Sequence, residues 1–314
     1  MIKNYFSTLL RLSIAITAGL LPFLSHAQKA KIFTTSDFDL KGKVKYCLVS
    51  TDYGKEEFNF NEDGLLTKLK TLYTNDSDYD MTYYKYANGE IVEKRVENYR
   101  DGVFDKNTSI ANIYTIDSTD SGKKITEKIV SYAKEFLDQY EYTYDKEDKL
   151  IRIVRNNDEG IENTLVAYSD VNGEVITTFT IDGELQKTIR VSETKTKTYT
   201  KQRIELTKEY LEGKPHKAVE QIFNENHKLV SEHTFRYDTI SNSFVSKELK
   251  TMTYNNLGMV AEVKTKTGKA LGVKNFIYQY DNGEKGNWIK QIITPDNTYI
   301  TRKIKYYETP VVKE

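Results

Sequence analysis

A spaced pattern of side chains recurs along most of this chain and constrains its fold more than any other feature. An aromatic residue is followed by Asn or Asp, two residues, a turn residue, one residue and an aliphatic residue. Four copies fit without gaps, and they begin at Phe60, Tyr144, Phe223 and Tyr254. Asn, Asp and Gly accept the backbone of tight turns, and alternate residues of a strand share one face. Each copy therefore predicts a β-hairpin.

Residues 140–154 show this hairpin most completely. Tyr140, Tyr142 and Tyr144 alternate with polar residues, residues 145–149 carry turn formers, and a return strand begins at Leu150. Looser copies with turns of other lengths begin at Tyr86, Tyr168 and Tyr280. The residues to which we assign a structural role in the turns are Phe60, Gly64, Tyr144, Asp145, Phe223, Asn224, Tyr254, Asn255, Gly258, Tyr280 and Asp281.

Hairpins in series predict an all-β fold. Successive aromatic markers lie about two strands apart, and the whole chain contains 4 prolines, so few strands are interrupted. We expect residues 44–307 to form one domain, an extended or curled antiparallel sheet of successive hairpins, with a closed β-barrel as the alternative. Residues 126–137 leave helix and strand both open, because helical spacing of apolar residues competes there with alternation.

Three of the strand ends carry the dipeptide Tyr-Asp, at Tyr144-Asp145, Tyr237-Asp238 and Tyr280-Asp281. With the turn spacing, these dipeptides resemble the signature of the YD-repeat (Rhs-like) family. The resemblance implies repeats that coil into a β shell or spiral, in proteins that are exported, surface-associated or secreted. The chain is similar to short secreted members from Bacteroidota-type Gram-negative bacteria.

The first 27 residues are typical of a secretory signal peptide. Lys3 and Arg11 precede an uncharged apolar run over residues 12–24, and Ser25 and Ala27 place small residues before a cut. The run is shorter than the roughly 20 residues that span a bilayer. We therefore expect cleavage after Ala27, a polar lead-in over residues 28–43, no transmembrane segment in the mature chain and a short tail at 308–314. The expected location is the periplasm, the cell surface or the medium.

The charge balance bears on the class of partner, and the cysteine content bears on disulfide formation. The chain carries 46 basic and 46 acidic residues, interspersed along its length. A nucleic-acid partner would require a basic face, so none is expected. Cys47 is the single cysteine, which rules out an intramolecular disulfide, and its strand context indicates a small buried side chain rather than a nucleophile.

No residue set commits to a reaction. The sequence contains no His-Glu-x-x-His, Gly-x-Ser-x-Gly or phosphate-loop motif. His216, His227 and His233 are expected on the surface, not in a ligand set. We predict no catalytic residue, no metal, no cofactor and no enzymatic activity.

Tyrosine is the one compositional excess, with 24 Tyr against 1 Trp. Aromatic rows on a sheet face can stack sugars or partner proteins, and the first candidates are Tyr84, Tyr142, Tyr278 and Trp288. The competing interpretation is that these rings pack hairpin against hairpin, because they recur with the repeat.

These observations predict an exported, non-enzymatic β-repeat protein that acts as a binding or structural module, with an unknown protein or glycan as partner. A carbohydrate-binding or glycan-processing accessory is the alternative. An outer-membrane barrel is disfavoured, because return strands such as residues 91–96 place charge on both faces.

Overall fold

Strands make up nearly all of the structure, a computed structural model that describes residues 31–74, 77–195, 200–284 and 286–308, without the side chains of residues 282–284. A short 3₁₀ helix, η1 (Thr35–Phe38), precedes twenty strands. The strands are β1 (Val44–Thr51), β2 (Gly54–Phe60), β3 (Leu66–Leu72), β4 (Tyr79–Ala87), β5 (Glu90–Arg100), β6 (Val103–Thr119), β7 (Gly122–Ser131), β8 (Phe136–Tyr144), β9 (Leu150–Asn157), β10 (Gly160–Val171), β11 (Glu174–Ile181), β12 (Glu184–Lys195), β13 (Lys201–Leu211), β14 (Lys214–Phe223), β15 (Leu229–Asp238), β16 (Ser243–Tyr254), β17 (Val260–Thr267), β18 (Ala270–Glu284), β19 (Trp288–Thr294) and β20 (Thr298–Tyr306). The predicted all-β class is confirmed. The predicted signal peptide and most of the tail lie outside the described residues.

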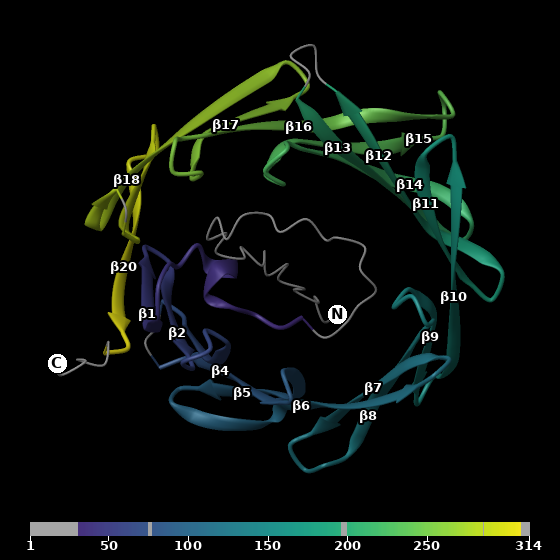
Figure 1. The fold of residues 1–314 in the computed structure, drawn as a ribbon, viewed down its shortest axis with the longest axis horizontal. Helices are drawn as coiled ribbons and strands as arrows, with labels where there is room; N and C mark the ends of the chain where they lie inside the picture. Colours follow the sequence, from purple (N-terminus) through teal and green to yellow (C-terminus); the bar gives the residue numbers. More distant parts are fainter. Residues whose placement is uncertain (1–30, 75–76, 196–199, 285, 309–314) are drawn as a thin grey trace, which may run out of the picture.

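The sheet closes on itself. Each strand pairs antiparallel with the next one in the chain, and β20 pairs with β1 over Val44 to Ser50. The result is a 20-stranded up-and-down barrel, which Figure 1 shows as a ring. Of the two arrangements that the sequence left open, the chain adopts the closed barrel. Closure removes the two free edges, whose unpaired N–H and C=O groups would otherwise bind other strands.

A barrel of this strand number is wide. Strands about 4.8 Å apart and tilted by about 40° give a diameter of roughly 40 Å between opposite walls. Side chains alone cannot fill such an interior. Part of the space is taken by the chain itself, because the segment that carries η1 lies inside the ring (Figure 1).

The two faces of the wall are distinguished by what touches the inner segment. Phe38 packs on Phe58 and Phe60, so these β2 residues face inward. Strand register carries the assignment around the barrel: Phe58 lies opposite Cys47 of β1, and Cys47 lies opposite Ile304 of β20. Buried apolar residues of the main core therefore line the inner face, and the residues between them face outward.

The repeated turns all lie at one end of the barrel, because each follows an even-numbered strand. We call this end, formed by the connections that follow even-numbered strands, the repeat rim. We call the opposite end, formed by the β1–β2, β3–β4 and later odd-numbered connections, the distal rim. The inward-facing aromatic residues that open the repeats, among them Phe60, Tyr144 and Phe223, form a belt just below the repeat rim.

The local geometry of the turns explains the repeated spacing. In the second position, Asn255 accepts backbone N–H groups of Leu257 and Met259 on its Oδ1 atom. In the fifth position the backbone is left-handed, with φ of 77° at Gly258 and 57° at His227. Asn61, Asp145 and Asn224 cap their turns in the same way, and Asp281 caps a longer turn through the N–H of Asn287. The pattern therefore encodes a capped turn with one left-handed residue.

Residues 31–43 of the predicted polar lead-in are docked inside the barrel. Thr34 bridges to Leu65, and the N–H of Leu66 donates to the carbonyl of Phe33. Asn287 holds the backbone of Lys41 with two hydrogen bonds of 2.7 and 2.9 Å. Phe33, Phe38 and Leu40 supply the apolar contacts. We call residues 31–43 the inner segment.

Residues 126–137 form strand and turn, so alternation prevails over helical spacing there. β7 ends at Ser131, and Ser131 accepts the N–H groups of Lys134 and Glu135 on its carbonyl and hydroxyl oxygens. Lys134 is left-handed at φ of 66°, which breaks a helical path. The charged stretch after residue 188 belongs to β12 and β13, apart from residues 196–199, which are outside the described residues.

Candidate functional site

Four tyrosines on the inner face each tie their own strand to the end of the repeat turn that precedes it. Their hydroxyls donate to the carbonyl of the aliphatic residue that ends the preceding turn pattern. The pairs are Tyr86 with Leu66, Tyr168 with Leu150, Tyr254 with Leu229 and Tyr278 with Val260, at 2.6 to 2.9 Å. We call these contacts the tyrosine staples. They fasten neighbouring hairpins below the repeat rim and give the recurrent Tyr a structural role.

The staples remain donors over the whole physiological pH range. Burial raises the pKa of Tyr86, Tyr254 and Tyr278 to about 12, and it also raises the pKa of Tyr168. A phenol that loses its proton could not donate to a carbonyl. The hydroxyls therefore serve hydrogen bonding and are poorly suited to proton transfer near neutral pH.

All four residues predicted to bind a ligand lie on the inner face. Tyr84, Tyr142 and Trp288 are 9%, 4% and 2% exposed, and Tyr278 is a half-buried staple. They come from β4, β8, β18 and β19, and only Tyr278 and Trp288 touch, with ring centroids 6.0 Å apart. All four belong to or pack against the main core, as the competing interpretation expects. Their role in ligand binding stays a prediction.

Glu127 is the centre of a polar cluster on the inner face of β6, β7 and β8. Its carboxylate accepts the hydroxyls of Tyr114 and Tyr142 at 2.9 and 3.1 Å and the side-chain amide of Asn112 at 2.7 Å. Burial, followed by the charge of Glu127, raises the pKa of both tyrosines. Three donors on one carboxylate fix three strands to each other. The motif search missed this cluster, because its members are far apart in sequence.

Arg302 joins the inner segment to the wall. It is 5% exposed, its guanidinium carbon lies 3.5 Å from the Trp288 ring centroid, and Nη2 donates to the carbonyl of Phe38 at 3.0 Å. Its Nε and Nη1 have no hydrogen-bond partner within the described residues. Burial lowers the pKa of Arg302 to about 10, while Cys47, Asp39 and Tyr278 oppose that shift. Both atoms are sealed from solvent by packed neighbours, so they offer no open binding position.

The wall formed by β13 to β16 is more polar inside than the wall beneath the inner segment. Glu205, 3% exposed, pairs with Arg203 at 2.7 Å. Gln221 donates to Glu232 at 2.9 Å, and Lys250 lies between Glu232 and Glu248. The Arg203–Glu205 and Lys250–Glu248 pairs each lie within one strand, whereas the contacts of Glu232 with Gln221 and Lys250 join β15 to its two neighbours and brace the wall.

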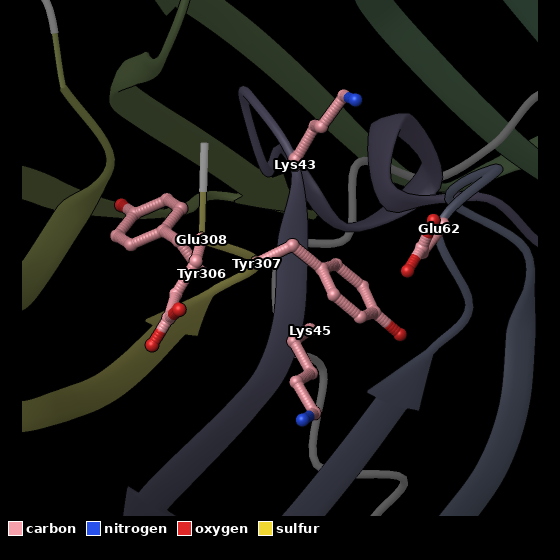
Figure 2. Close-up of a pocket in the computed structure, with 6 residues that line it drawn as sticks. All are labelled: Lys43, Lys45, Glu62, Tyr306, Tyr307 and Glu308. Atoms are coloured by element: carbon pink, nitrogen blue, oxygen red, sulfur yellow. The ribbon is translucent and has the colours of Figure 1, made fainter. Parts of the chain in front are cut away.

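A shallow hollow of about 450 Å³ lies at the repeat rim, where β1 meets β20 (Figure 2). Lys43 and Lys45 extend in opposite directions, and Tyr307 lies between them with its hydroxyl on the carbonyl of Phe60. Glu62, Tyr306 and Glu308 complete the lining. The cations do not converge on one point, so the hollow lacks the geometry of an anion site.

Metal and nucleophile chemistry find no assembled site in the described part of the chain. No group of three or more His, Cys, Asp or Glu residues there could hold a metal ion. His227 occupies a left-handed turn position, and His233 hydrogen bonds Ser246 at 2.7 Å. Burial raises the pKa of Cys47 to about 11, which keeps the thiol protonated. Among the described residues, no helix is long and apolar enough to cross a membrane.

The fold and its interior define a class: a closed antiparallel barrel of twenty strands, stapled by repeat tyrosines, with a segment near its N-terminus docked on the inner wall. No family model matches the chain, so the YD-repeat resemblance stays a prediction. No curated protein matches it either.

Several solved structures show weak similarity. A porin-like protein from Bacteroides uniformis ATCC 8492 shares 10% identity over 83% of this chain and 98% of its own, with a TM-score of 0.28. A porin-like protein from Bacteroides vulgatus ATCC 8482 shares 9% over 85% and 99%, with a TM-score of 0.26. The TcdB2-TccC3-Cdc42 structure shares 11% over 76% of this chain and 15% of its own, with a TM-score of 0.17. Scores this low carry no weight for fold or function.

Proposed function

We propose that the protein is an exported, non-enzymatic β-barrel that works in an aqueous compartment as a structural or binding module. The observation that carries the proposal is the charge on its outer face. A barrel that contacts lipid needs an apolar outer band about 25 Å tall. This barrel instead carries ion pairs among the outward-facing side chains of its strands.

The outward direction of these charges follows from register. Lys85 and Glu93 are neighbours of the inward-facing Tyr84 and Lys94 pair, and Lys85 Nζ lies 2.9 Å from Glu93 Oε2. Arg95 extends the same cluster at 2.7 Å from Glu93. On the next wall, Lys124 pairs with Glu141 at 2.9 Å.

Further lysines place charge on the outer face elsewhere around the ring. Lys303 follows the inward-facing Arg302, and Lys264 pairs with Glu262 at 3.0 Å on β17. Charged side chains at mid-strand are costly on a lipid face. The outer wall is therefore suited to water, which supports the periplasm, the cell surface or the medium as the location.

The interior supports a structural role. Many inner-face polar groups are engaged in staples, in the Glu127 cluster or in ion pairs of the β13–β16 wall. Catalysis needs groups that are placed to interact with the transition state of a bound substrate. The interactions on the inner wall instead fix strands and hold the inner segment.

Fractionation of cells that export the full chain tests this proposal. We expect the protein in the periplasmic or culture fraction without detergent. In denaturing gels we expect the heated and unheated samples to migrate alike. A protein that pellets with membranes, resists an alkaline wash, needs detergent for release and shows heat-modifiable migration would contradict the proposal and favour a membrane barrel.

A carbohydrate-binding role is the second candidate, supported by the abundance of tyrosine. Polysaccharide pull-down with Tyr278→Ala and Trp288→Ala tests it. Because both rings are inside the wall, each variant needs a folding control by circular dichroism. Retention on a glycan that both folded variants lose would support this candidate over a purely structural role.

A further inference from the structure

Exposed apolar side chains lie at several tips of the distal rim, and three successive tips carry five of them. Val103, Tyr132, Phe136, Leu137 and Ile161 are 68%, 43%, 50%, 42% and 73% exposed. They come from three successive connections, β5–β6, β7–β8 and β9–β10. We call these five residues the distal patch. Single exposed apolar residues are ordinary on a protein surface, but a cluster from neighbouring hairpins marks an interaction surface.

Two contacts link neighbouring tips within this part of the rim. Phe104, beside Val103, packs edge-on to Tyr132 with ring centroids 4.6 Å apart. Phe136 and Leu137 line a hollow of about 400 Å³ with Asn157 and Asp158 of the next connection. The hollow therefore lies between two neighbouring hairpin tips, with apolar side chains on one side and polar ones on the other.

The tip of the β7–β8 hairpin has a defined shape. The N–H groups of Lys134 and Glu135 bond to Ser131, and the N–H of Ser131 donates to the carbonyl of Glu135 at 2.8 Å. A tip that is ordered before binding loses little conformational entropy when it meets a partner. Its two charged residues, Lys134 and Glu135, are placed beside the apolar ones.

We propose that the distal patch is the interface of a homodimer, in which a second copy of this chain packs two-fold symmetrically on the β7–β8 and β9–β10 tips. The proposal is independent of the compartment in which the barrel works.

The exposed area matches what a dimer requires. At the stated exposures, side chains that present on the order of 150–250 Å² when free leave roughly 500 Å² of apolar surface over the five residues. A stable interface buries about 800 Å² per partner, and a homodimer interface is about 65% apolar, or roughly 520 Å². Burial of the exposed area of all five residues in the contact would supply that apolar share.

The local charges fit a copy of the same surface better than a lipid surface. Lys134 lies on one tip, and Asp158 and Glu159 lie on the next. In a two-fold contact each residue meets its complement twice, so Lys134 of each copy can face Asp158 of the other. The acidic pair would oppose an anionic membrane surface. The hollow beside Phe136 is also large enough for an aromatic ring from the second copy.

Sedimentation velocity on the chain from Gln28 to Glu314, up to about 100 µM, tests the proposal. We expect a monomer–dimer equilibrium, and we expect the double variant Phe136→Lys and Leu137→Lys to weaken association at least tenfold. The matched control is Ile240→Lys, because Ile240 is 94% exposed on the β15–β16 connection, away from the patch. This control should leave the equilibrium unchanged.

A charge exchange tests the two-fold geometry without touching the apolar residues. Lys134→Glu should weaken the dimer, and Lys134→Glu combined with Asp158→Lys should restore it. A chain that stays monomeric at the highest concentration overturns the proposal, and so does a dimer that the Phe136 and Leu137 variant leaves intact. Binding of the monomer to phosphatidylcholine vesicles through the same residues would assign the patch to lipid and also overturn it.

Discussion

Removal of one tyrosine staple gives the most direct test of how the repeats are held together. Tyr254 donates its hydroxyl to the carbonyl of Leu229 at 2.6 Å, and Leu229 is 4% exposed. Tyr254→Phe removes this bond and leaves the ring in place. An intramolecular hydrogen bond contributes about 1 kcal/mol net, and loss of a partner at a buried carbonyl adds to the cost, so we expect a loss of about 1–2 kcal/mol in the free energy of unfolding.

Tyr144→Phe is the matched control. Tyr144 opens its own repeat and is 3% exposed, but its hydroxyl has no hydrogen-bond partner among the described residues. Removal of a buried, unpaired hydroxyl should leave stability unchanged or raise it by about 1 kcal/mol. The two variants delete the same oxygen from the first position of two copies of the pattern, so the difference between them isolates the hydrogen bond.

Urea unfolding followed by the fluorescence of the single Trp288, which is buried in the wall, measures both changes. The four staples lie on separate hairpins, so their losses should add when all four tyrosines become Phe, to about 4–8 kcal/mol. That sum approaches the whole stability of many domains. Equal effects of Tyr254→Phe and Tyr144→Phe would refute the staple as a source of stability.

Three further predictions concern a buried acid, a turn and the inner segment. Burial raises the pKa of Glu56 from 4.5 to about 7. Between these two pH values the folded state keeps a proton that the unfolded chain releases. The free energy of unfolding should therefore fall by up to about 3 kcal/mol as the pH rises from 4.5 to 7. Urea midpoints measured at pH 5 and pH 8 should show this fall for the native chain and not for Glu56→Gln. Gly122→Ala should destabilise the fold severely, because the new Cβ would lie 2.1 Å from the carbonyl oxygen of Tyr144. The control Gly89→Ala places its Cβ in open space and should cost about 1 kcal/mol. Similar shifts in melting temperature for the two variants would contradict this prediction. Phe38→Ala should weaken docking of the inner segment on the wall by about 3 kcal/mol, and trypsin should then cleave after Lys41 and Lys43 about 100-fold faster. Unchanged cleavage would show that the Phe38 contacts do not hold the segment.

The hairpins could be predicted because each is a local event. The residue after the aromatic caps the turn, and the fifth position is left-handed, so a few residues carry the whole signal. His227 illustrates the point, because it takes a turn geometry that Gly takes elsewhere. The order of strands followed directly from hairpins in series.

Closure and the docked inner segment depend on contacts between distant residues. Nothing local in β1 or β20 specifies that Cys47 should lie opposite Ile304. The sequence of the inner segment shows neither strand nor helix periodicity. Its Phe33 and Phe38 are buried only because they pack against core residues of the barrel wall, which come from distant parts of the chain. The candidate ligand residues are rings on a sheet face, but a closed sheet has two unlike faces, and the alternation of residues does not specify which face is inside.

The pairing of β1 with β20 has a consequence for how the chain reaches its native state. The N–H and C=O groups on one edge of β1 pair only with β20, which is more than two hundred residues later in the chain. These groups therefore stay unpaired until the last strand has been made. During synthesis or export the growing sheet is open. Without its C-terminal strand it would keep two edge strands with unpaired N–H and C=O groups. Premature termination anywhere before Thr298 should therefore yield material prone to aggregate, not a smaller functional barrel.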